Sequence, residues 1–114
     1  MEKLRIAIAT NEKNGLGDVV SNVFGRAKTF TIVDAENENI TDVRVLVNSA
    51  VSYHHGAGPI AVKMLIDEGV NVVLANALGF GASELLKQHN VNLIQVKPGT
   101  NVEDATKKAM RKHK

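Results

Sequence analysis

The chain of 114 residues is long enough for one domain with a buried core, and the absence of cysteine excludes disulfide bridges, thiolate zinc sites and a cysteine nucleophile. Its formal charge of +2 comes from the C-terminus, because the nine basic and twelve acidic residues of positions 1–104 give a charge of −3. Residues 1–104 are thus not basic, and the chain has only one Tyr and three Phe to stack on bases, which argues against a surface that binds nucleic acid.

The first residues carry neither a basic leader nor a long apolar run, and no later run approaches the length that spans a bilayer. We therefore expect a soluble, cytoplasmic protein that does not contact a membrane. The cations at 107–114 suit the last turn of a helix, where positive charge opposes the negative end of the helix dipole. This explanation is preferred to an arm that binds nucleic acid.

The N-terminal half predicts three strands. Residues 4–9 alternate large apolar residues with mostly small ones, which is typical of a central strand covered on both faces. A polar, glycine-bearing loop follows at 10–18, and the second strand is expected at 29–34. Residues 35–39 predict a hairpin loop, and the third strand at 40–47 has one polar face, as an edge strand does.

The C-terminal half alternates helices with strands. Proline suits the first position of a helix, so Pro59 is expected to begin the first one. Thr100 and Glu103 form a capping box for the last one, whose inner face is predicted to carry Val102, Ala105, Ala109 and Met110. The expected elements are a helix at 59–68, a strand at 70–75, a helix through 83–87, a strand at 91–96 and the final helix.

This order of elements predicts a single α/β domain over residues 1–114. A hairpin followed by two strand–helix–strand units gives a mixed sheet, because each right-handed crossover makes its strands parallel. The ribonuclease-H-like strand order 3-2-1-4-5, with the second strand antiparallel and helices on both faces in three layers, satisfies the pattern. Open α/β sheets bind ligands at the carboxyl ends of their strands, beside the point where the strand order reverses. We therefore expect a cleft among the loops at 10–18, 48–58, 77–81 and 97–100.

His54 and His55 are the most distinctive residues of this edge. They are adjacent, so in an extended segment they point apart and do not chelate one metal together. His55 is the preferred metal ligand because it touches the glycine turn, and His54 is the second candidate. A solvated or hydrogen-bonded loop histidine is the competing interpretation of each residue.

Glycines make up the other candidate binding groups. Gly56 and Gly58 allow the backbone to approach a ligand, and the helix that follows offers N–H groups to an anion. Gly79 and Gly81 have the same position before the next helix, with Phe80 between them as a shield from water. Both segments also suit simple loop-to-helix transitions. The loop from Asn11 and the charge of Arg26 complete the candidate cleft.

Other site chemistries are not supported. Residues 25–29 lack the first glycine of a phosphate loop and lead into a strand, so no nucleotide is expected there. The central strands carry no carboxylates for a two-metal nuclease, and Asp34 falls at the opposite edge. No catalytic signature is recognisable elsewhere, so we do not expect an enzyme.

The motifs in this order resemble the dinitrogenase iron–molybdenum cofactor biosynthesis family. The likeness covers essentially the whole chain and rests on the glycine-bearing loop after the first strand, Val-Phe-Gly-Arg-Ala at 23–27, His-Gly-Ala-Gly-Pro at 55–59 and Leu-Gly-Phe-Gly-Ala at 78–82. The resemblance implies a ribonuclease-H-like fold and the binding, carriage or insertion of an iron–sulfur or molybdenum-containing cluster, without catalytic turnover. Because cluster iron is usually held by thiolates, the lack of cysteine favours a carrier of a finished cluster.

The leading hypothesis is thus a non-enzymatic carrier, related to nitrogen fixation, of a preassembled anionic iron–sulfur or iron–molybdenum-type cluster. Its protein partners would be cofactor-biosynthesis or acceptor proteins. The alternative is a metal-free regulatory module that binds a partner protein through the same loops or an edge strand, and a small hydrolase is the least supported. We expect a monomer or a weak homodimer paired through 43–47 or 91–96.

Overall fold

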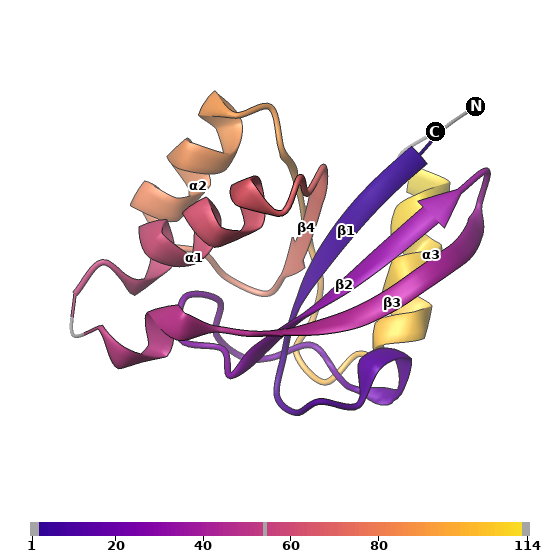
Figure 1. The fold of residues 1–114 in the computed structure, drawn as a ribbon, viewed down its shortest axis with the longest axis horizontal. Coiled ribbons are helices and arrows are strands. Elements are labelled where there is room, and N and C mark those ends of the chain that lie inside the picture. Colours follow the sequence, from indigo (N-terminus) through magenta and orange to yellow (C-terminus); the bar gives the residue numbers. More distant parts are fainter. Residues whose placement is uncertain (1–2, 54, 113–114) are drawn as a thin grey trace.

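The structure is a computed structural model that describes residues 3–53 and 55–112, and its strands form one five-stranded mixed sheet (Figure 1). The elements are β1 (Lys3–Thr10), β2 (Thr29–Glu36), β3 (Asn39–Val47), α1 (Ala57–Asp67), β4 (Val72–Ala75), α2 (Phe80–Gln88), β5 (Asn92–Gln95) and α3 (Val102–Lys112). The strand order is β3-β2-β1-β4-β5. Because β2 is antiparallel to both neighbours and the other pairs are parallel, the predicted topology is confirmed.

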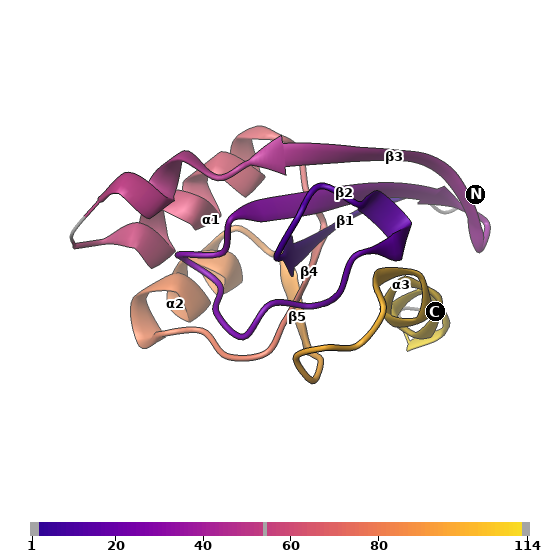
Figure 2. The ribbon, with the colours of Figure 1, turned by 90° about the horizontal axis from the view of Figure 1, so that it is seen from below.

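Helices cover both faces of the sheet, which gives the three predicted layers (Figures 1 and 2). Strand β1 is the centre: Ala7 and Ala9 face α1 and α2, whereas Ile6 and Ile8 face α3, and all four are completely buried. The small residues lie beneath two helices and the large ones beneath one. None of the helices in the described part of the chain is long and apolar enough to cross a bilayer.

The hairpin between β2 and β3 is tighter than predicted. The strands continue to Glu36 and from Asn39, so the turn consists of Asn37 and Glu38 instead of five loop residues. Both turn residues have positive φ angles, 53° and 70°, as in a type I′ turn whose twist matches that of the strands. The predicted five-residue loop was wrong because this short turn keeps both strands paired to their ends.

Helices α1 and α2 also begin earlier than predicted. Helix α1 begins at Ala57, after Gly56 with a φ of 76°, so Pro59 is its third residue and not its first. The first-turn N–H groups of a helix have no partner within it, and a proline there costs no hydrogen bond. Helix α2 begins at Phe80, three residues before the predicted start.

Helix α3 has the predicted inner face but a different cap. Val102, Ala105, Ala109 and Met110 are buried against the sheet. The side chain of Asn101, and not that of Thr100, accepts the hydrogen bond from the N–H of Asp104, at 3.1 Å. The capping-box prediction was therefore displaced by one residue.

Candidate functional site

A cavity of about 650 Å³ lies at the carboxyl edge of the sheet, where the topology places a ligand. Three separate segments build it: the chain that leads into β2, the turn before α1, and the loop from β4 into α2. Its lining residues are Asn22, Val23, Phe24, Gly25, Arg26, His55, Gly56, Ala57, Gly58, Pro59, Ala77, Gly79, Gly81 and Ala82. The structure thus brings together six of the proposed site residues: Arg26, His55, Gly56, Gly58, Gly79 and Gly81.

The N-termini of two helices meet at this cavity. A Cβ atom built on Gly58 of α1 would lie 3.4 Å from the Cβ of Ala82 in α2, and one on Gly81 would lie 3.6 Å from Pro59. The glycines therefore permit the two first turns to pack against each other. Because the N-terminus of each helix carries partial positive charge, two such ends side by side favour an anion between or beside them.

The first turns also present main-chain donors. The first bond within α1 runs from Ile60 to Gly56 and the first within α2 from Ser83 to Gly79, both at 3.1 Å. The N–H groups of Ala57 and Gly58 in α1, and those of Phe80 and Gly81 in α2, precede these bonds and have no intrahelical acceptor. The cavity is therefore lined by backbone groups suited to a negatively charged ligand.

Asn48 holds loops of the cavity in position, although it was not among the residues selected from the sequence. Its buried side-chain amide donates to the carbonyl oxygens of Gly25 and Ala27, at 3.0 and 2.8 Å, and its oxygen accepts from the N–H of Ala50. One side chain directly after β3 thus fixes both the approach to β2 and the short turn at Ser49–Ser52. Its signal in the sequence is an asparagine directly after a strand, typical of a cap.

Two charged or titratable side chains lie at the mouth of the cavity. Arg26 is exposed, and its guanidinium donates to the carbonyl oxygen of Val51 at 3.3 Å, which fixes its position beside the site. His55 is exposed and lines the cavity, whereas His54 lies outside the described residues. Within residues 3–53 and 55–112, no three His, Cys, Asp or Glu side chains are arranged to hold a metal ion.

Phe80 and Asn11 do not line this cavity. Phe80 is the first residue of α2 and is 82% exposed, so it does not have the shielding position expected from the sequence. The loop from Asn11 is held instead by the buried carboxylate of Asp18, which accepts hydrogen bonds from four main-chain N–H groups. Asn101 of the α3 cap donates to this loop at Leu16, so the loop is attached to the opposite helical layer.

Exposed apolar side chains surround the cavity mouth. Among the large hydrophobic residues exposed in the described chain, Val23, Val51, Tyr53 and Phe80 belong to the segments that build or border the cavity. We call these four residues the apolar rim. Such a group at the mouth of a cavity is typical of a surface that meets another molecule.

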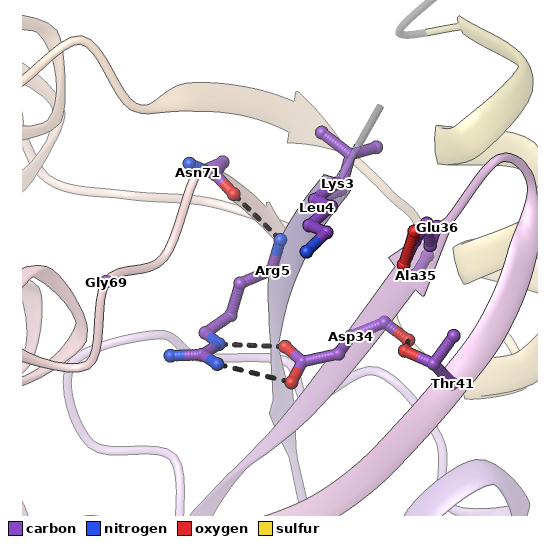
Figure 3. Close-up of a pocket in the computed structure, with 9 residues that line it drawn as sticks. All are labelled: Lys3, Leu4, Arg5, Asp34, Ala35, Glu36, Thr41, Gly69 and Asn71. Carbon is purple, nitrogen blue, oxygen red and sulfur yellow. Dashed lines mark hydrogen bonds and ion pairs between the residues drawn. The ribbon is translucent and has the colours of Figure 1, made fainter. Parts of the chain in front are cut away.

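A second hollow, of about 370 Å³, lies at the opposite edge of the sheet (Figure 3). Arg5 donates to both carboxylate oxygens of Asp34, at 2.8 and 3.2 Å, and to the carbonyl oxygen of Glu68. The hydrogen bonds and charge of Asp34 raise the pKa of Arg5 above its ordinary value. Because the guanidinium is engaged by these partners, this hollow is better explained by a structural ion pair than by a ligand site.

Comparisons with known proteins agree with this geometry. A family model described as dinitrogenase iron–molybdenum cofactor matches residues 2–112. The solved structure of the apo form of the orange protein from Desulfovibrio gigas superposes on this chain with a TM-score of 0.85 and 30% sequence identity. The superposition covers 95% of this chain and 88% of that protein.

Two further relatives are similar over most of their length. The solution structure of a putative NifB protein from Thermotoga, of the DUF35 family, has a TM-score of 0.74 and 32% identity, with 96% of this chain and 88% of that chain covered. An uncharacterized protein of Methanocaldococcus jannaschii is 27% identical over 84 residues, which are 74% of this chain and 70% of the relative.

Proposed function

The chain belongs to the dinitrogenase iron–molybdenum cofactor family, and from this premise we propose that it binds and carries a preassembled, anionic iron–sulfur or molybdenum-containing cluster without catalysing a reaction. In this role it acts in the cytoplasm and exchanges its cargo with cofactor-biosynthesis or acceptor proteins. The cluster is cargo here and not a permanent part of the protein.

The observation that carries the proposal is the glycine-lined cavity at the meeting point of α1 and α2. A cluster that already contains its sulfide ligands needs positive potential, N–H donors and space, and it does not need thiolates from the protein. The two helix N-termini and Arg26 supply the positive potential and the N–H donors, and the cavity supplies the space. His55 is the candidate for direct contact with a metal of the cluster.

The relatives support this proposal. The orange protein is described in an apo form, a term that implies a ligand-bound form of that protein, and it is 30% identical to this chain. The Thermotoga relative is described as a putative NifB protein. The lack of cysteine in this chain is consistent with a cluster assembled elsewhere.

Anaerobic titration with tetrathiomolybdate and with isolated iron–molybdenum cofactor, followed by metal analysis of the desalted protein, tests the proposal. Gly79→Leu places a side chain into open space at the cavity, because a Cβ there meets no atom within 4 Å. Gly17 has equally open surroundings away from the cavity, so Gly17→Leu is the matched control. We expect Gly79→Leu to abolish binding and Gly17→Leu to retain it. Absence of binding to the unmodified protein, or equal binding by both variants, would contradict the proposal.

The apolar rim favours a second candidate function, a metal-free regulatory module that binds a partner protein. Tyr53 and Phe80 offer aromatic surface of the kind that dominates protein interfaces. Binding of a purified cofactor-biosynthesis protein to metal-free protein, with loss on Phe80→Ser, would support this function. A requirement for bound cluster in the same experiment would favour the carrier.

A further inference from the structure

A groove of about 730 Å³ is lined by residues of β5 and α3 and of the loop between them. Helix α3 lies on the face of the sheet opposite α1 and α2 (Figure 2). The groove shares no lining residue with the candidate cluster site. Its floor is aliphatic, with Ile94 and Val96 from the strand side and Ala105 and Ala109 from the helix. The groove is therefore a separate surface with its own chemistry.

The groove exists because the two faces of the sheet are covered unequally. Two α-helices pack on one face, whereas α3 is the only α-helix of the described residues on the other. Helix α3 packs with Ala105 and Ala109 on the central strands, and Ile94 and Val96 at the β5 edge remain only partly buried. The space beside α3 has the position that a second helix would take on this face.

Cations line this groove. Its lining cations are Lys97, Lys107, Lys108 and Arg111, whereas Asp104 is the one carboxylate among the described residues that line it. The helix dipole accounts for positive charge near the end of α3, but it does not account for Lys97, which follows β5. Positive charge thus reaches the groove from both walls.

We propose that this groove binds an acidic amphipathic helix of a partner protein. The apolar side of such a helix would lie beside α3 on Ile94 and Val96, which are only partly buried. Its carboxylates would face the groove cations, of which Lys108 and Arg111 are exposed. The partner surface does not require bound cluster, so it is independent of the proposed cargo.

A second copy of this chain does not fit the groove as well as an acidic partner does. Among the described helices, α1 carries Lys63 and Asp67, α2 carries Glu84 and Lys87, and α3 is basic. None of these three helices supplies an excess of carboxylates. Nucleic acid is also disfavoured, because no aromatic residue of the described chain lines the groove to stack on bases.

The test uses the cluster-free protein and a fluorescein-labelled peptide of about 14 residues, near the usual length of a protein helix. The peptide has Leu at helical i, i+3 and i+4 spacing and Glu at its other positions. We expect it to bind, to bind less tightly as salt is added, and to shift the amide NMR signals of Ile94, Val96 and α3. The double substitution Lys108→Glu/Arg111→Glu should weaken binding about tenfold, because two attractions at the rim become repulsions.

The matched control is Lys13→Glu/Lys63→Glu, which changes the net charge equally but lies outside the groove. This variant should keep the affinity within about twofold, since salt screens distant surface charges. Thermal unfolding of both double variants verifies that they fold. Four outcomes would overturn the proposal: no peptide binding, equal loss in both variants, equally tight binding of a peptide with the same residues in scrambled order, or tighter binding of single-stranded RNA.

Discussion

A Cβ atom built on Gly25 would lie 2.6 Å from the main-chain nitrogen of Gly58 and 2.8 Å from its Cα atom. Real Cβ atoms do not approach other atoms so closely, so the chain leading into β2 and the first turn of α1 fit together only with glycine at position 25. This contact places two walls of the candidate cavity against each other. The shape of the site therefore depends on a residue that has no side chain.

The substitution Gly25→Ala should destabilise the protein. The new methyl group meets backbone atoms, which cannot rotate away, so we expect a loss of about 1–3 kcal/mol in the free energy of unfolding. Urea unfolding measures this loss. Gly79→Ala is the control, because its Cβ would meet nothing within 4 Å and its φ of −69° suits any residue. Equal stability of the two variants would show that the α1 turn moves freely away from Gly25.

Asn48→Ala should cost more than the loss of an exposed asparagine. It leaves the carbonyl oxygens of Gly25, which is partly buried, and Ala27, which is buried, without their amide donor, and we expect a loss of about 2–3 kcal/mol in the free energy of unfolding. Asn76→Ala removes one long hydrogen bond of 3.5 Å at the surface and serves as the control. Chemical denaturation compares the two, and a cost for Asn48→Ala as small as that of the control contradicts the anchoring role.

The strand order could be predicted from the sequence because it depends on local patterns. The alternation in β1 and the apolar run of β4 mark both as buried, and the two crossovers then fix their neighbours. The helix starts could not be predicted in the same way. The start of α1 was predicted at Pro59 because proline suits the first helical position, yet Gly58 and Gly81, whose helix propensity is poor, lie inside the first turns of α1 and α2. Packing of the two first turns against each other outweighs that local preference.

Part of the candidate site could also be grouped from the sequence, because the strand order determines which loops meet. Its glycines and Arg26 lie where the topology brings the loops together, so a correct strand order was sufficient to group them. Asn48 and Asp18 could not be selected, because their partners are main-chain groups whose positions depend on the folded loops. Phe80 was expected in the loop before α2 as a shield for the site, whereas it is the first residue of α2 and is exposed.

Asp18→Asn should loosen the loop that follows β1. The carboxylate is buried and accepts main-chain hydrogen bonds through both oxygens, including 2.8 Å from Val19 and 3.0 Å from Glu12. In asparagine, one of the two accepting oxygens is replaced by an NH₂ group, which would face main-chain N–H groups and could not accept their hydrogen bonds. We therefore expect a loss of about 2–4 kcal/mol in the free energy of unfolding. Asp67→Asn, at an exposed position of α1, should have little effect. Faster hydrogen exchange at Glu12 and Asn14 would verify that the effect is in the loop, and unchanged exchange there would contradict it.

Arg5→Lys tests the ion pair at the opposite edge of the sheet. Lysine keeps the charge but loses the paired hydrogen bonds to Asp34, and because both side chains are partly exposed we expect a cost of about 1 kcal/mol. The folded-state pKa of Arg5 is raised, so its contribution is present below the unfolded value and is lost only at extreme alkaline pH. The cost should therefore stay constant from neutral to mildly alkaline pH in thermal unfolding. Arg44 donates a hydrogen bond of 2.7 Å to a single carboxylate oxygen of Glu68, so Arg44→Lys should cost less.

Arg26→Gln should weaken cluster binding while leaving the fold intact. Glutamine retains an N–H group that can donate to the carbonyl oxygen of Val51, but it removes the positive charge at the cavity mouth. We expect the affinity for tetrathiomolybdate to fall about three- to tenfold, with a smaller difference at high salt, as for an attraction between partly exposed charges. Arg44→Gln removes an equal charge from β3 outside the cavity, so a general loss of charge predicts the same effect for both variants. Anaerobic equilibrium dialysis at two salt concentrations distinguishes the two explanations, because only a charge placed at the cavity makes the loss specific to Arg26→Gln.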